Sequence, residues 1–405
     1  MTPSPNLFPQ FDDGGPPLTT PILPPKLACE IPRVVSAYAM AVNAEKAAVL
    51  IVKTSSNAER DAAARDVVAS RVVGFLFPAL VKMVSTLGII AIHRITDEVV
   101  SANNNAQIYA VGTLYIDHFL SSFRTTNTAI RPPSTHPSRP SMSEMEDMLI
   151  DAMKNSVNDH SSARERALAR DGYHCLITNT INISSFNQHP AIKKLQSQTG
   201  AATHVVQTCH IFNESILQNI EVDANFPQET RRQHAGSALG ILRMFGLTEL
   251  VDRLMSFDKT DVASASGVHD LINIISLSSD PHQAFDTLKL TFEPVEGQEN
   301  TYDVVFAHPQ IALGLFGLKN QITLTNFADP GKFKKAAGGV IELPLPSRQL
   351  LALHAVCARV AHMSGAAEAL DKHDRDLEET WVLARDGGSA NLLHMMLSPL
   401  VSATA

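Results

Sequence analysis

The chain has 405 residues, of which 44% are apolar and 18% charged, and its formal net charge is −8. A disordered chain is poorer in apolar residues and richer in net charge, so this composition predicts a soluble globular protein with two or three packed units. It excludes collagen, coiled coils and small disulfide-stapled domains. The acidity argues against a protein coated in positive charge, and it restricts any nucleic-acid contact to a local basic groove.

The N-terminal region and the cysteines indicate the compartment. Residues 1–32 are rich in proline and have no apolar core segment, so they predict a disordered or extended arm rather than a signal peptide. The chain has 4 cysteines, which lie far apart and form no C-x-x-C pair. This usage is typical of reduced thiols in an intracellular protein, and it leaves nucleus and cytoplasm equally open.

Residues 33–130 have the apolar spacing of helices, as in the repeat of Ala64, Val68 and Val72, and predict a helical N-terminal domain. The apolar run 72–93 is long enough to suggest a membrane span. It has Lys82 near its middle and contains a proline and a glycine, so we expect a buried helical hairpin and no membrane contact.

A Pro-rich linker is expected at 131–141, because four prolines in eleven residues cannot continue a helix. Beyond it, the β-branched and aromatic runs at 173–178 and 203–212 predict two strands, and residues 229–256 predict a helical region with a stop at Gly246. Alternating apolar residues around Phe292, followed by a polar turn, predict a β-hairpin. The tail is expected to be helical from about residue 347.

Three polar residues stand out from the 16 histidines and the rest of the chain by their context. His210 ends a strand-like run, Asn273 lies within the apolar run LINIISL, and His282 follows nine residues later. This order predicts that Asn273 and His282 share one short helical segment that faces the strand bearing His210.

The runs RDGYHCLIT (170–178), CHIF, LINIISL and HQAFD together resemble the HNH endonuclease domain, as found in fungal proteins that embed it between helical segments. The resemblance implies an α+β fold, mostly helical, with an embedded ββα-metal domain. That domain would span 142–310, with a helical insertion at 213–265 and a β-hairpin. A C-terminal segment, 311–405, would follow it.

The resemblance also implies metal-dependent hydrolysis of phosphodiester bonds in nucleic acid, with DNA favoured over RNA. His210 would be the general base, Asn273 would orient it or help to hold the metal, and His282 would bind the metal or the phosphate. A neutral imidazole suits the base because its pKa lies near the working pH. The implied cofactor is a divalent ion, Mg²⁺ first, with Zn²⁺ or Mn²⁺ as alternatives.

One position departs from the family pattern, because Cys209 stands where many members have an acidic metal ligand. A thiolate is a poor ligand for Mg²⁺ and a better one for zinc, so Cys209 joins His282 and Asn273 as a candidate ligand. Nearby carboxylates could replace the missing acid: Glu214, Asp280 and Asp286. Candidate substrate contacts are Arg170, Arg231 and Arg232. The competing hypothesis is a catalytically impaired HNH scaffold that binds nucleic acid or protein.

Overall fold

The computed structural model describes residues 4–11, 15–125, 160–188, 190–213, 238–255, 267–327 and 343–379. Helices and strands both occur in this part of the chain, which confirms the α+β class. The expected linker at 131–141, the insertion segments 214–237 and 256–266, and the residues Arg231, Arg232 and Glu214 lie outside the described residues.

The N-terminal helical region is confirmed. It contains α1 (Pro32–Thr54), α2 (Asn57–Lys82), α3 (Val84–Leu87), α4 (Ile90–Val100) and α5 (Asn105–Leu114), followed by a π-helical turn at Tyr115–Leu120 and a 3₁₀ turn at Ser121–Phe123. The run 72–93 is broken as expected, because α2 ends at Lys82 and Gly88, with φ 76°, ends α3. It is buried only in part, since Ile89 and Ile90 are exposed. Pro78 stays inside α2.

One helix in the described part of the chain, α1, is long and apolar enough to cross a membrane by length and composition. Half of its most apolar window is buried inside the protein. The core helix of a globular protein passes the same test, so this finding is weak evidence for a span.

The main sheet has the order β1 (Asn6–Leu7), β7 (Thr301–Phe306), β6 (Leu290–Pro294), and β8 (Gln321–Thr323) pairs with the other half of β7. The hairpin expected around Phe292 is confirmed, since β6 and β7 are antiparallel with Phe292 opposite Val304. The predicted helical tail is confirmed as α14 (Arg348–Ser364), which Ser347 caps by accepting a hydrogen bond from the Leu350 N–H. After Gly365, α15 (Ala366–Glu379) follows.

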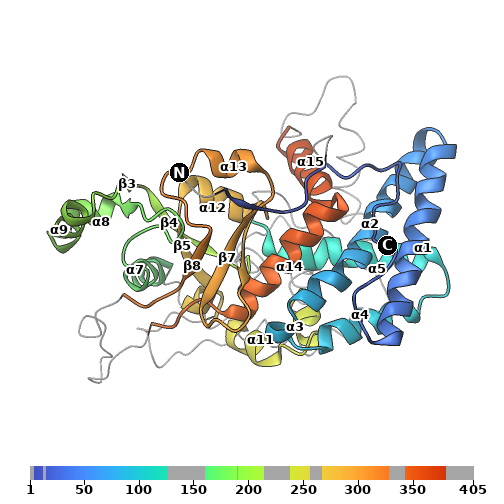
Figure 1. Ribbon diagram of the computed structural model, residues 1–405, viewed down its shortest axis with the longest axis horizontal. Coiled ribbons are helices and arrows are strands. Elements are labelled where there is room, and N and C mark those ends of the chain that lie inside the picture. The colour runs from blue at the N-terminus through green and yellow to red at the C-terminus, as the bar shows by residue number, and fades with distance from the viewer. Residues whose placement is uncertain are drawn as a thin grey trace, which may run out of the picture.

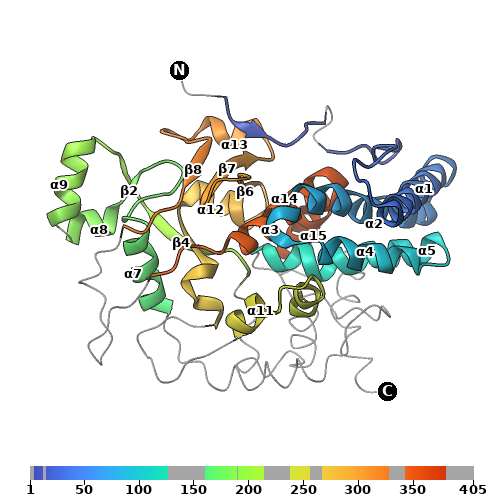
Figure 2. The ribbon, with the colours of Figure 1, turned by 60° about the horizontal axis from the view of Figure 1, so that its bottom comes forward.

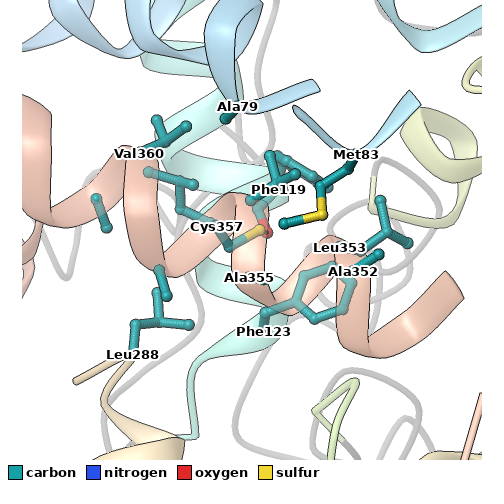
Figure 3. Packing of buried hydrophobic residues seen from close by; sticks show 14 of the residues in the cluster. Ala79, Met83, Phe119, Phe123, Leu288, Ala352, Leu353, Ala355, Cys357 and Val360 are labelled. Carbon is teal, nitrogen blue, oxygen red and sulfur yellow. Dashed lines mark hydrogen bonds between the residues drawn. The ribbon is translucent and has the colours of Figure 1, made fainter. Parts of the chain in front are cut away.

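Helix α14 joins the two halves of the molecule, because it packs against both α2 and β6 (Figures 1 and 2). Figure 3 shows part of this contact, where Cys357 lies beside Met83 and Phe119, and Val360 lies near Ala79. One continuous apolar core therefore contains residues of the N-terminal helices, the sheet and the tail. Helix α14 therefore covers apolar faces of both α2 and β6.

The arm expected at 1–32 is not disordered in its described residues, because parts of it pack against the rest of the protein. β1 pairs in parallel with β7, and Phe8 is 1% exposed. The buried Arg71 guanidinium donates to Glu45 at 2.7 Å and to two arm carbonyl groups, while the Glu45 carboxylate accepts two backbone N–H groups of the arm. A buried ion pair thus supplies the hydrogen bonds that the irregular arm cannot make with itself.

The central region contains the remaining elements: α7 (His160–Arg170), β2 (Ile181–Asn182), α8 (Ile183–Gln188), α9 (Pro190–Thr199), β3 (Thr203–His204), β4 (Val206–His210), α11 (Thr248–Met255), β5 (Ile274–Ser278), α12 (Ser279–Asp286) and α13 (Pro309–Leu313). Gly246, with φ 83°, ends the helical segment 238–244 as expected. The strand expected at 173–178 is wrong, because the chain turns there and both Tyr173 and Asn179 have φ 60°.

A close helix contact predicts a large effect for a small substitution. A Cβ atom added to Gly112 of α5 would lie 2.1 Å from the carbonyl oxygen of Ala69 in α2. We expect Gly112→Ala to lower the free energy of unfolding by about 1–3 kcal/mol, because the two helices must move apart. Urea unfolding measures this, with Gly314→Ala as control, since a Cβ there meets nothing within 4 Å. Equal stability of the two variants would contradict the close contact.

Candidate functional site

A ββα unit lies in the middle of the chain. β4 and β5 pair antiparallel, with Val206 opposite Ser278 and His210 opposite Ile274, and α12 follows β5 directly. Helix α12 packs back against β4. The chain order is therefore strand, insertion, strand, helix, and His210 is the last residue of the first strand.

Two imidazole rings meet at the end of β4. His210 Nε2 lies 3.1 Å from Nδ1 of His269, and the ring centroids are 5.2 Å apart. His269 ends a 3₁₀ turn, Gly267–His269, that lies 59 residues further along the chain. Both residues are half-buried, so the pair lies at the protein surface without being fully exposed.

Asn273 holds this pair in place through its side chain. The residue is completely buried, and its Oδ1 accepts a hydrogen bond from the Phe212 N–H at 2.7 Å. Its Nδ2 donates to the carbonyl groups of Phe212 at 3.0 Å and Val268 at 2.9 Å. One side chain thus links the segment directly after His210 to the residue directly before His269. Asn273 acts as a positioning residue.

A second contact fixes the His269 turn from the other side. Asp270 accepts two hydrogen bonds from Arg253 of α11, at 2.7 and 3.2 Å, and a third from the Ile272 N–H at 3.0 Å. Charge-assisted bidentate pairs of this kind restrict both side chains. The turn that presents His269 is therefore held by a helix of the insertion as well as by Asn273.

His282 lies elsewhere on the ββα unit. Its Nδ1 is 3.0 Å from Gln207 Oε1, and its Nε2 is 3.1 Å from Asp286 Oδ2. Gln207 lies three residues before His210, which corresponds to about 10 Å along a strand and to the opposite face. The expected convergence of His210 and His282 is therefore wrong. Asn273 and His282 also do not share a helix, because β5 separates them.

Cys209 does not suit the predicted metal ligand role. Its side chain is 1% exposed, and burial, followed by the charge of Asp286, raises the pKa of its thiol well above the usual value. Neighbouring residues of a strand face opposite sides, so the Cys209 thiol and the His210 ring do not point the same way. The Asn273 amide is used by its backbone contacts, and His282 pairs with Gln207, so these residues do not gather around one point. Within the described segments, no group of three or more His, Cys, Asp or Glu residues could hold a metal ion.

Arg170 has a structural role instead of the predicted substrate contact. The side chain is 0% exposed, and it donates two hydrogen bonds to the carboxylate of Asp171. Its other N–H groups donate to the carbonyl groups of Leu271, Ile274 and Pro344. All five guanidinium N–H groups are therefore used inside the protein, and the residue braces the segment that contains Asn273.

His269 was not among the site residues predicted from the sequence. The only local signal was its place four residues before Asn273 in the run GVHDLIN, and nothing in that spacing distinguishes it from the other histidines. No family model, no curated protein and no solved structure matches the chain. The functional conclusion therefore rests on the geometry of the His210 site and on the HNH-like sequence runs.

Proposed function

We propose that this protein is an endonuclease that hydrolyses phosphodiester bonds in nucleic acid, with DNA as the first substrate to test. The observation that carries the proposal is the imidazole pair of His210 and His269, which Asn273 positions at the end of β4. The chain order of β4, β5 and α12 and the HNH-like runs give further support.

The imidazole pair has the properties of an acid and a base at once. In the neutral pair, one ring must donate its N–H to the facing nitrogen of the other ring. The pair as a whole therefore combines a proton acceptor with a proton donor. The acceptor can remove a proton from an attacking water, and the donor can protonate or hydrogen-bond a phosphate or leaving-group oxygen.

Asn273 contributes by fixing the distance between the rings before any substrate binds. General acid–base catalysis requires hydrogen-bonding reach between the base and the proton that it removes. Because the Asn273 amide contacts both flanking segments, the backbone next to His210 and next to His269 cannot separate without breaking a buried hydrogen bond. An unpaired buried amide is costly, so this arrangement favours a fixed site.

The HNH resemblance implies a divalent ion, yet the predicted ligands do not fit one. Cys209 is buried in the apolar interior, and the Asn273 amide is used by the backbone. His282 and Asp286 offer one imidazole and one carboxylate, but both ring nitrogens of His282 already have partners in Gln207 and Asp286. We therefore assign no step to a metal, and the test includes metal arms.

The test is nicking of supercoiled plasmid by the purified protein, alone, with Mg²⁺, Mn²⁺ or Zn²⁺, and with EDTA. We expect His210→Ala to reduce the nicking rate about 10²- to 10⁴-fold and His269→Ala to reduce it to a similar extent. The exposed His204 provides a matched control, because His204→Ala removes a histidine outside the pair. A His210→Ala variant that nicks as fast as wild type would overturn the proposal.

A second candidate is a catalytically impaired HNH-like scaffold that binds nucleic acid or protein. The buried, protonated Cys209 at the position of the usual acidic ligand favours it. This scaffold would bind labelled DNA or RNA in a gel-shift assay while wild type and His210→Ala are equally inactive with every metal. Nicking that depends on His210 would exclude it.

A further inference from the structure

A pocket is lined by residues of α9, β8 and the segment 172–181, and it shares no lining residue with the imidazole pair. Its volume is about 610 Å³, within the range of roughly 300–1,000 Å³ that small-molecule sites occupy. The buried part of the wall is apolar and comes from several elements: Ala169, Leu176, Ile181, Ile192, Ile322 and Leu324. The pocket is therefore preformed by the fold, and its wall does not depend on one loop.

Aromatic rings line one part of the pocket. His174 and Phe327 are in edge-to-face contact, with centroids 5.5 Å apart, and Tyr173 lies beside them. Phe327 is 60% exposed, although it is a large apolar side chain. Burial, together with the nearby charge of Lys319, lowers the pKa of His174, so this ring is neutral at pH 7. Neutral aromatic surfaces of this kind favour a planar ring system.

The charge of the pocket has one sign. Of the described residues that line it, Lys319 alone carries a permanent charge, and none is Asp or Glu. The backbone N–H of Lys319 donates to the Ile177 carbonyl at 2.9 Å, which attaches the β8 side of the pocket to the 172–181 segment. An anionic group at the mouth therefore meets an attractive charge from the described lining residues.

The wall also contains strained backbone. Tyr173 and Asn179 have φ 60°, which is unusual for residues with a side chain and most unusual for a bulky aromatic. A Cβ atom on Gly172 would lie 2.9 Å from the His174 ring, so the backbone approaches that ring closely. Strained conformations gather at ligand-binding sites, where the surrounding structure holds them. Here the strain places Tyr173 and His174 at the pocket.

We infer that this pocket binds a small organic anion with a planar apolar body, whose rings contact the aromatic wall and whose negative charge lies near Lys319. The inference is independent of the endonuclease proposal, because none of the lining residues belongs to the imidazole pair. The apolar wall excludes water and contributes most of the affinity. Lys319 contributes selectivity for the charge.

Two probes with the same rings test the inference in the full chain. 8-Anilinonaphthalene-1-sulfonate carries one negative charge, and N-phenyl-1-naphthylamine lacks the sulfonate. We expect Lys319→Met to weaken binding of the anionic probe about threefold to fivefold, measured by fluorescence titration, and to leave the neutral probe unchanged. Lys194→Met is the matched control, since Lys194 is an exposed lysine of α9 outside the lining.

Filling the pocket tests its location. Ala201→Phe and Thr325→Phe enlarge two lining residues that come from separate parts of the wall, and we expect each to abolish one binding site per chain for both probes. Circular dichroism checks the fold, and the exposed Thr325 provides a second variant if Ala201→Phe unfolds. Wild-type binding in a folded filled variant would overturn the inference. An equal effect of Lys319→Met and Lys194→Met would overturn the role of the charge.

Discussion

Arg170→Lys is expected to lower the free energy of unfolding by about 3–5 kcal/mol, which is the usual cost of breaking a buried ion pair. The guanidinium of Arg170 makes five hydrogen bonds in the interior, two to Asp171 and three to backbone carbonyl groups. An ammonium group has three donors at one point and cannot span these acceptors. Asp171, which is 1% exposed, would lose its bidentate partner without regaining water.

Urea unfolding of Arg170→Lys and of Arg164→Lys, both in α7, measures the effect. Arg164 also lies on α7 but is exposed, so Arg164→Lys should change the stability by less than about 0.5 kcal/mol. A stable Arg170→Lys variant that has lost nucleic-acid binding would restore the role predicted from the sequence. A destabilised variant with proportionate loss of all activities would support the structural role.

The second large effect is a loss of stability in acid through His354. This ring is completely buried, stacks on Phe285 with centroids 3.8 Å apart, and has partners for both nitrogens in Thr291 and the Phe285 carbonyl. Burial lowers its pKa to about 3. In the unfolded chain the histidine binds a proton below about pH 6.5, whereas in the folded protein it stays neutral. Stability is therefore complete above pH 6.5 and falls as the pH decreases towards 3.

The expected size follows from the difference between the two pKa values. Between pH 7 and pH 4, this one residue should lower the free energy of unfolding by about 3 kcal/mol, at roughly 1.4 kcal/mol per pH unit below 6.5. His354→Gln, which does not titrate, should be less stable at pH 7 but should lose less stability on acidification. The exposed His93 provides the control, since His93→Gln should keep the wild-type slope. Identical pH slopes for His354→Gln and wild type would contradict the buried, neutral state.

Several elements could be predicted from the sequence because short-range physics determines them. Ser347 supplies a cap to the N–H groups that begin α14, and Gly246 adopts the positive φ that ends a helical segment. The alternation around Phe292 predicts a strand, and β6 forms there, with residues 290–293 buried on both faces. Each of these signals lies within a few residues of the feature that it predicts.

The failed predictions concern partners that are distant in the chain. The 173–178 run has strand-like residues, but positive φ values at Tyr173 and Asn179 turn the chain, and contacts with β5 and the 317–319 segment hold it there. The arm lacks periodicity, yet Arg71 and Glu45 anchor it from two helices. Pattern analysis records neither kind of contact.

The sequence by itself determined the α+β class, the helical N-terminal region, the β6–β7 hairpin and the helical tail, because periodicity, caps and turn residues act locally. It also selected His210 and Asn273, both of which belong to the candidate site. Only the tertiary structure decided that His269 is the partner of His210, that His282 lies apart, and that Arg170 is internal. Those roles depend on contacts between side chains and partners that are 59 to more than 100 residues apart in the chain. They also depend on which charged groups are buried away from water. No local sequence pattern encodes either property.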